Sequence, residues 1–355
     1  MVPLRRRILP LLGVFLGAPV AAEYLQAYLP FTGELWASLF GIVFFAPLYG
    51  GAALLIREVA VRTDMGWPGT LLLAAAFGVA MTGIIDLSKF GEERPDVPYW
   101  AELREPTLIE PLGVSVAATL SWTAGHVMMS VGAPLALLYA LAPAHRGRPL
   151  LGKIGIPLTL ACAAVIALAV HQDGQHAYGY TLSAGRAIAV LAVVVLLVVM
   201  AVVVSTRAGA RTRTGESDPG DDSRQRVPAS AVVAGAVGLK MAVDLMPSTW
   251  FGVAGTVVVL AVAGIGLHRM SARRRWRPRE IGLLGAGLVI GAILIGSLAP
   301  VPDGVPIGAK LAQSSVLLAL ALALLWLVLR RTAAPAPAAS SGSSGVAHFS
   351  ARQSR

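Results

Sequence analysis

Long apolar runs separated by short polar connections make up most of the chain. An apolar run of about 20 residues can cross the ~30 Å hydrocarbon layer of a membrane as an α-helix. Ten runs meet this requirement, at residues 8–29, 36–57, 67–88, 113–142, 152–171, 186–206, 228–247, 250–268, 280–299 and 309–329. The pattern therefore predicts an all-α, polytopic bundle of about ten transmembrane helices.

Basic residues fall mainly on one set of connections. Of the 29 Lys and Arg residues, 23 lie before the first predicted helix, after the even-numbered helices or in the C-terminal segment. The other connections hold 5, and Lys240 lies within a predicted helix. Because connections rich in Lys and Arg stay in the cytoplasm, this distribution predicts a cell-membrane protein with both termini cytoplasmic.

The N-terminal segment also has the features of a cleavable signal peptide. Three arginines precede an apolar stretch at 8–20, and the small residues Ala21 and Ala22 precede Glu23. The apolar pattern continues through Leu25 and Tyr28, which favours an uncleaved first helix. Cleavage would leave nine helices in the same orientation.

Two polar, low-complexity segments divide the chain. Residues 207–227 mix both charges with Gly and Pro, which predicts a disordered cytoplasmic linker. Residues 332–355 are rich in Ala, Pro, Ser and Gly, which predicts a disordered cytoplasmic tail. The resulting organisation is a six-helix region at 1–206 and a four-helix region at 228–331.

Composition supports a membrane protein and argues against a nucleic-acid-binding one. The chain is 56% hydrophobic and 14% charged, with a mean hydropathy of +0.71. Its net charge of +10 is spread over short clusters between apolar runs and does not form one basic face. The single cysteine, Cys162, excludes an intramolecular disulfide. We therefore predict the lipid bilayer as the main partner.

Ionisable residues at membrane depth are costly and usually face the bundle interior or a cavity. His126 lies midway along the fourth predicted helix, with Trp122, Met129 and Ser130 on the same face. It is a candidate proton relay or substrate ligand. A hydrogen bond to a neighbouring helix is the structural alternative.

Two carboxylates complete the candidate site of the first four helices. Glu23 and Asp86 lie near the outer ends of the first and third predicted helices. Together with His126 and Ser130 they could bind a cation or small solute in an outward-facing cavity. The alternative is that each carboxylate is half-solvated at the membrane interface.

Lys240 and Asp244 are one helical turn apart in the seventh predicted helix. Residues at this spacing share a helix face, so the two side chains can form an intramembrane ion pair. This structural interpretation is favoured over a coupling-ion site.

Three prolines stand beside small residues within predicted helices. They are Pro19, Pro47 and Pro134. Proline removes a backbone hydrogen bond and bends a helix, and interrupted helices form binding sites in many transporters. Close helix packing through Gly and Ala is the alternative.

The longest external connection, residues 89–112, carries six acidic and three basic residues and four prolines. Connections of this length are usually functional or unstructured. The segment is therefore either an ordered lid over the outer face that attracts cations or a solvated connector.

Motifs for known chemistry are absent from the sequence, which has no phosphate-binding Gly-rich loop, CxxC pair, GxSxG or HExxH. Glu58 with Arg62 and Trp122 with His126 loosely resemble the CAAX-protease and bacteriocin-processing family of intramembrane metalloproteases. In that family a second glutamate precedes the first motif, whereas this chain has Arg57. The family also has a further helix that bears a histidine, and no second intramembrane histidine is evident in this chain. We predict no metal and no cofactor, and the sequence favours a non-enzymatic protein while leaving enzymatic activity open.

The stretches PLYGGAALLIREVAVR, YWAELREPTLIEPLG and GHVMMSVGAP resemble multi-pass membrane proteins of actinobacterial type over roughly residues 8–145. That group has no assigned activity, so no functional residue can be transferred. The sequence favours a permease or channel-like protein for a small solute or cation. A degenerate protease-like enzyme and a structural or regulatory membrane protein are the alternatives.

Overall fold

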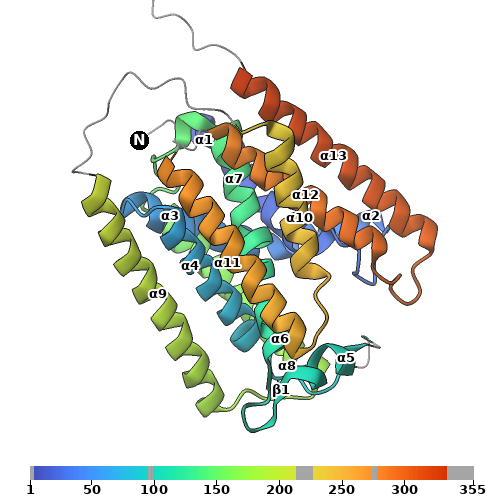
Figure 1. The fold of residues 1–355 in the computed structure, drawn as a ribbon. Helices are drawn as coiled ribbons and strands as arrows, with labels where there is room; N and C mark the ends of the chain where they lie inside the picture. The colour runs from blue at the N-terminus through green and yellow to red at the C-terminus, as the bar shows by residue number, and fades with distance from the viewer. Residues whose placement is uncertain (1–3, 95–96, 98, 213–226, 274–277, 334–355) are drawn as a thin grey trace, which may run out of the picture.

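The structure is a computed structural model that describes residues 4–94, 97, 99–212, 227–273 and 278–333. Most of these residues are helical (Figure 1). The α-helices are α1 (Leu4–Pro19), α2 (Leu35–Phe45), α3 (Gly51–Arg62), α4 (Trp67–Ala80), α5 (Trp100–Arg104), α6 (Val116–Gly125), α7 (Ala133–Leu141), α8 (Gly155–Tyr178), α9 (Ala184–Thr212), α10 (Ala229–Asp244), α11 (Trp250–Arg273), α12 (Pro278–Leu298) and α13 (Ile307–Ala333).

Several of these helices join end to end through π-helical turns. The turns are η1 (Val20–Tyr24), η2 (Ala46–Gly50), η3 (Met81–Ile85) and η6 (His126–Gly132). Short 3-10 turns occur at η4 (Glu105–Thr107), η5 (Glu110–Leu112) and η7 (Pro143–His145). Thus α2 and α3 form one continuous segment, and so do α6 and α7.

Within the described residues, nine helical segments are long and apolar enough to cross a membrane. The all-α prediction is confirmed, and each of these segments overlaps one of the predicted spans. The remaining predicted span, 228–247, corresponds to α10, whose 16 residues are shorter than the others.

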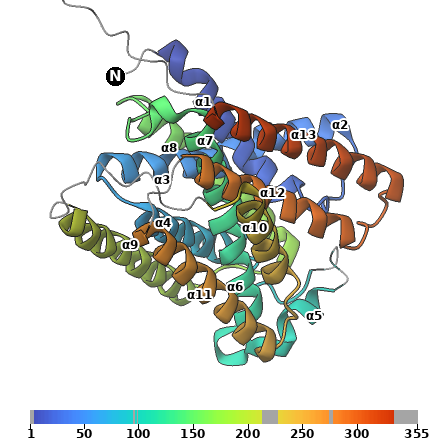
Figure 2. The same ribbon diagram turned by 45° about the horizontal axis from the view of Figure 1, so that its top comes forward.

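Helix α12 forms the centre of the C-terminal half and packs against α7, α10 and α13 (Figures 1 and 2). Its glycines allow this close approach. A Cβ at Gly285 would lie 2.9 Å from the Ala136 side chain, and one at Gly291 would lie 2.9 Å from Lys240 Cβ. Small residues at helix contacts are the usual means of packing in membranes. In the N-terminal half, α4 packs along α9.

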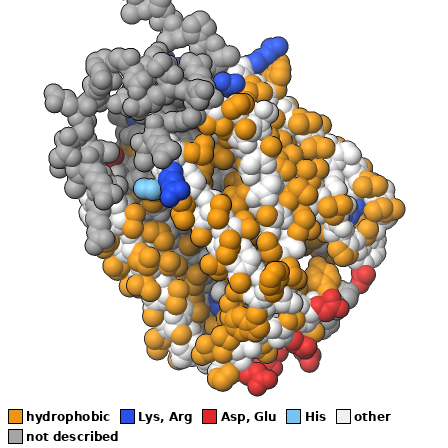
Figure 3. All heavy atoms as spheres, viewed as in Figure 1, with side chains coloured by type: hydrophobic (Ala, Val, Ile, Leu, Met, Phe, Trp, Pro, Cys, Tyr) orange, Lys and Arg blue, Asp and Glu red, His pale blue; other side chains and the backbone are white. Residues whose placement is uncertain are grey.

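The outer faces of the bundle are apolar, and charge collects at its two ends. Hydrophobic side chains cover most of the visible surface in Figure 3, with acidic side chains at the lower end and basic side chains toward the upper end. Helices α8 and α9 expose large apolar side chains such as Leu158, Val165 and Leu196. An apolar belt between charged ends is the surface expected of a membrane protein.

The connection at 86–115 is largely ordered. It contains α5 and a short antiparallel pair, β1 (Leu108–Ile109) with β2 (Val114–Ser115), in which Leu108 is opposite Ser115. Trp100, Arg104 and Thr107 are buried within it. The Arg104 guanidinium donates to the carbonyl of Gly113 at 3.0 Å, which ties α5 to the hairpin. The described residues of this connection are therefore not a freely solvated connector.

Two predicted segment boundaries differ from the structure. Helix α9 continues to Thr212, so the first residues of the predicted linker are helical. Helix α13 likewise extends to Ala333. Ala and Arg, common at both places, are strong helix formers. The rest of the predicted linker and tail lies outside the described residues.

Candidate functional site

Four wide helical turns interrupt the N-terminal transmembrane segments. In η2 and η6 the hydrogen bonds span five residues, from the amide of Gly51 to the carbonyl of Ala46 and from Ala133 to Met128. Such π-helical turns are rare in proteins, but those that do occur are often found at functional sites. The η6 turn contacts both η1 and η2, so three of the four turns lie together.

Proline lies within or next to three of the four wide turns. Pro19 directly precedes η1, Pro47 lies within η2, and Pro134 follows η6 by one residue. A proline ring clashes with the carbonyl four residues earlier in a regular helix. For Pro134 that carbonyl belongs to Ser130 within η6, where the widened turn moves it away and lets the helix continue. The predicted bends are thus local widenings of continuous helices.

Glycine at position 50 allows η2 to pack directly on α1. A Cβ placed on Gly50 would lie 2.5 Å from Phe15 Cα and would also meet the Phe15 carbonyl. We expect Gly50→Ala to lower the thermal unfolding midpoint, because overpacking against backbone costs ~1–3 kcal/mol. Gly13→Ala in α1 is the control, since a Cβ there meets nothing within 4 Å. Equal midpoints for both variants would contradict this packing.

The Glu23 carboxylate lies in η1 between two tyrosines. The hydroxyl of Tyr28 donates to one carboxylate oxygen, and the hydroxyl of Tyr49 in η2 donates to the other. Tyr49 is buried, whereas Tyr28 is 42% exposed. The carboxylate therefore links the buried Tyr49 of η2 to the partly exposed Tyr28 that follows η1.

His126 lies against the opposite side of Tyr49. The two rings stack with centroids 6.0 Å apart, and Phe77 packs edge-on to the imidazole at 5.6 Å. The Nδ1 atom of His126 is 2.9 Å from the hydroxyl of Ser130, one turn later in the same helix. This hydrogen bond is within one helix, so it does not join two helices. The contacts with Tyr49 and Phe77 do join helices, through packing.

Asp86 follows η3, where its carboxylate accepts hydrogen bonds from the amide and hydroxyl of Ser88 at 2.8 and 2.6 Å. Burial raises the pKa of Asp86 to about 6, and the negative charge of Glu23 adds to this shift. The Ser88 hydrogen bonds and Arg94 act in the opposite direction.

Lys89 supplies a buried positive charge that interacts electrostatically with Asp86. Its side chain is 6% exposed, and its ammonium donates to the Thr119 hydroxyl at 3.4 Å. Burial lowers the pKa of Lys89 to about 8, while Asp86 partly restores it. Contacts through Tyr49 join Glu23 to His126 and Ser130, and Asp86 and Lys89 are linked to this group by electrostatic interactions. We call these residues the outer cluster.

The outer cluster includes groups that sequence reasoning missed. Tyr49 connects Glu23 to His126, and neither Tyr28 nor Lys89 was among the candidate residues. Lys89 had been counted only as a connection residue. The position of Tyr49, two residues after Pro47 in an apolar run, was the available signal.

The raised pKa of Asp86 predicts the sign of a pH effect on stability. The folded protein binds this proton more tightly than the unfolded chain, whose Asp pKa is 3.8. The stability contributed by the protonated form is therefore lost as the pH rises toward about 6. We expect the thermal midpoint to fall between pH 4.5 and 6.5 less steeply in Asp86→Asn than in the wild type. Parallel slopes would contradict this assignment.

Lys240 and Asp244 form the predicted ion pair in α10. Lys240 is 3% exposed, and Gln26 also donates to Asp244, at 2.9 Å. Lys240→Met alone should destabilise the protein by ~1–3 kcal/mol, because it leaves the part-buried Asp244 carboxylate without its positive partner. The double variant Lys240→Met/Asp244→Leu should recover much of the lost midpoint in thermal unfolding. A double variant less stable than the single one would argue against pairing as the main role.

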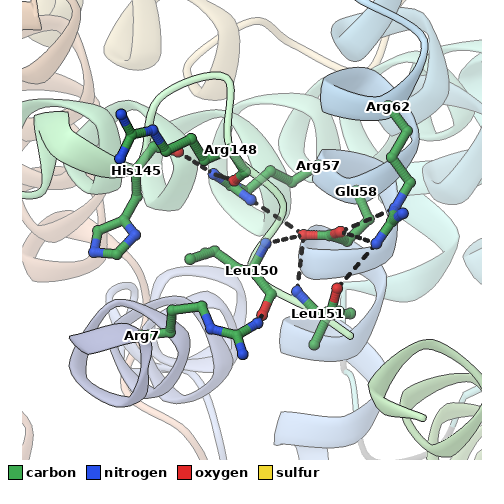
Figure 4. Close-up of polar contacts among 8 residues, drawn as sticks. All are labelled: Arg7, Arg57, Glu58, Arg62, His145, Arg148, Leu150 and Leu151. Atoms are coloured by element: carbon green, nitrogen blue, oxygen red, sulfur yellow. Dashed lines mark hydrogen bonds and ion pairs between the residues drawn. The ribbon is translucent and has the colours of Figure 1, made fainter. Parts of the chain in front are cut away.

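A second polar cluster, the inner network, lies around the end of α3 (Figure 4). One oxygen of Glu58 accepts from the amides of Leu150 and Leu151 at 2.6 and 3.0 Å. The same oxygen pairs with Arg57 at 3.2 Å, and the other pairs with Arg62 at 3.1 Å. The i,i+4 pairing of Glu58 with Arg62 agrees with the sequence interpretation.

Arginine side chains extend the inner network to the connection at 142–153. The fully buried Arg57 donates to the carbonyls of His145 and Arg148 at 2.6 and 2.9 Å. Arg62 donates to the carbonyl of Leu151 at 2.9 Å, and Arg7 of α1 donates to that of Leu150 at 2.7 Å. These bonds hold the connection against α1 and α3.

The protease resemblance gains no support from these contacts. It requires Glu58 and His126 to share a metal ion or a water molecule. Glu58 instead binds two arginines and two backbone amides, while His126 contacts Tyr49, Phe77 and Ser130. Over the described part of the chain, no group of three or more His, Cys, Asp or Glu side chains is arranged to hold a metal ion.

The two clusters therefore differ in character. The inner network is densely hydrogen-bonded to backbone, whereas the outer cluster consists of side chains that interact with one another. No protein-family model, curated protein or solved structure matches the chain, so both clusters are interpreted from their geometry.

Proposed function

We propose that the protein is a permease or channel-like transporter for a small solute or cation. It crosses the cell membrane ten times, with both termini in the cytoplasm. The tenth span is α10, whose 16 residues cover ~24 Å as a helix and pack along α12. The flanking residues 227–228 and 245–247 supply the remaining length.

Two observations support this orientation. The start of α1 and the end of α13 lie at the same end of the molecule in both views (Figures 1 and 2). Basic side chains gather toward that end and acidic side chains at the other (Figure 3). Such an asymmetry supports a cytoplasmic location for the basic end.

The observation that carries the transport proposal is the position of the outer cluster on wide helical turns. Glu23 lies in η1, Tyr49 in η2, and His126 and Ser130 in η6. Wide turns free backbone carbonyls at membrane depth, where they are tolerated if they line a cavity or contact other protein groups. A polar, interrupted region between helices is the usual form of a transporter binding site.

The chemistry of the outer cluster suits a cation or a proton-linked solute. The negative charge of Glu23 raises the pKa of Asp86, and two carboxylates that repel each other in this way favour a bound positive charge. The Tyr28 and Tyr49 hydroxyls each donate a hydrogen bond to Glu23 and so hold its carboxylate in position to bind a cation or a proton. The ordered connection at 86–115 carries an excess of acidic residues, which attracts cations toward this end.

A substrate-blind flux measurement tests this proposal. The purified protein is placed in liposomes, and uptake of protons and of monovalent cations is followed with trapped indicator dyes. We expect flux above that of empty liposomes, and its loss in His126→Ala. Equal flux in wild type and His126→Ala removes His126 from the mechanism, and no flux above empty liposomes contradicts ion transport.

A further inference from the structure

The inner network has an unbalanced charge. In the contacts of the described residues, Arg57 and Arg62 share a single carboxylate, Glu58, and Arg7 donates only to the carbonyl of Leu150. Three positive charges are thus set against one negative charge, and Arg7 has no acidic partner within the described structure. Arg7 is 9% exposed and Arg57 is fully buried. Buried charge without a counter-charge is costly at a membrane surface, which indicates that an anion belongs near this network.

Unpartnered nitrogen atoms occur on the same residues. Arg7 Nε, Arg57 Nε and His145 Nδ1 are buried without a hydrogen-bond partner in the described structure. The His145 side chain is itself 7% exposed. Leaving a buried polar group unsatisfied costs ~1–3 kcal/mol. A ligand rich in acceptor oxygens, accommodated by a small adjustment of these side chains, would relieve that cost.

The side chains that lack an acidic partner gather along one segment. His145 and Arg148 belong to the connection at 142–153, and in Figure 4 both side chains extend away from the Glu58 carboxylate. Arg7 reaches this connection from α1 through the carbonyl of Leu150. The Arg148 side chain is exposed, so it is free to meet a ligand at the membrane surface.

We infer that Arg7, His145 and Arg148 bind a phosphate group, carried by an anionic phospholipid of the inner leaflet or by a free phosphate ion. Phosphate presents several acceptor oxygens that match arginine forks and an imidazole N–H. Anionic headgroups are concentrated at the cytoplasmic surface, where basic sites between helices bind them. The bound phosphate supplies the missing negative charge and fixes the 142–153 connection.

This inference uses the inner network and does not depend on the transport proposal. Thermal unfolding of the full chain in neutral detergent, followed by tryptophan fluorescence, provides the test. Two probes are added separately at constant ionic strength, inorganic phosphate and phosphatidylglycerol, with phosphatidylcholine as the lipid control. We expect at least one anionic probe to raise the midpoint of the wild type.

Variants of the phosphate-binding side chains decide specificity. Arg148→Gln removes an exposed side chain and leaves its backbone bond to Arg57 intact, so it should fold, and His145→Gln provides a second variant. We expect apparent affinity on the order of tenfold weaker in each, as for loss of one charge-assisted hydrogen bond. Arg5→Gln, an exposed arginine on the same helix as Arg7, should bind as the wild type does.

The outcomes are distinct. A response to phosphatidylglycerol alone supports the lipid as source, and a response to inorganic phosphate supports the free ion. The inference is overturned if neither probe shifts the wild-type midpoint, or if Arg148→Gln and His145→Gln retain full affinity. An equal loss in Arg5→Gln also overturns it, because that result indicates general surface attraction.

Discussion

Glu58→Gln is expected to destabilise the protein by ~3–5 kcal/mol, the cost typical of breaking a buried ion pair from one side. Arg57 is 0% exposed, and Glu58 supplies its one carboxylate contact among the described residues. Glutamine keeps the shape of the side chain but removes the charge. Glutamine also has a single acceptor oxygen, so it can accept fewer of the hydrogen bonds that the Leu150 and Leu151 amides and the two arginines donate to Glu58.

The measurement is thermal unfolding of purified protein in one detergent at one pH. Asp64→Asn is the matched control, because Asp64 is an exposed carboxylate shortly after α3. We expect a large fall of the midpoint for Glu58→Gln and almost none for Asp64→Asn. Similar midpoints for the two variants would show that the inner network does not hold α1, α3 and the 142–153 connection together.

Glu23→Gln is expected to reduce flux through the protein at least about tenfold, the effect of losing a charge-assisted hydrogen bond of ~1.5 kcal/mol or more. The substitution preserves the size of the side chain and its ability to pair with the Tyr28 and Tyr49 hydroxyls. It removes the negative charge and the site at which a proton can bind. Folding should therefore be retained while transport is lost.

The control for this prediction is Glu34→Gln, an exposed carboxylate that precedes α2. Flux into liposomes is compared at matched protein content, with unfolding midpoints recorded for each variant. Tyr49→Phe should give an intermediate loss, because it removes one hydrogen bond and keeps the ring that stacks on His126. If Glu23→Gln transports as fast as Glu34→Gln, Glu23 is not part of the site.

Much of the helical architecture could be predicted from sequence because each membrane helix is encoded locally. A helix of about 20 apolar residues spans the hydrocarbon layer and makes its backbone hydrogen bonds within one segment. The prolines at 19, 47 and 134 correctly marked irregular backbone. The type of irregularity was not predictable, since the choice between a break and a widened turn depends on the neighbouring helices.

The contacts of the candidate site were harder to predict from the sequence. The pairing of Glu23 with Tyr49 joins α1 to η2 and is set by tertiary packing. Arg57 was interpreted only as a departure from the protease motif, whereas it is fully buried and bonds to carbonyls near residues 145–148. By contrast, Lys240 with Asp244 and Glu58 with Arg62 were predictable, because helical spacing alone brings them together.

Water access to the outer cluster tests the central claim most directly. The chain has one cysteine, Cys162, so Cys162→Ser provides a background for single-cysteine labelling. Ser130→Cys places a thiol beside His126, and Val243→Cys places one in the packed core as a control. The protein is exposed in liposomes or cells to a membrane-impermeant thiol reagent. Transport through the cluster predicts labelling of Ser130→Cys well above Val243→Cys. No labelling of Ser130→Cys from either side of the membrane would contradict a solute path there.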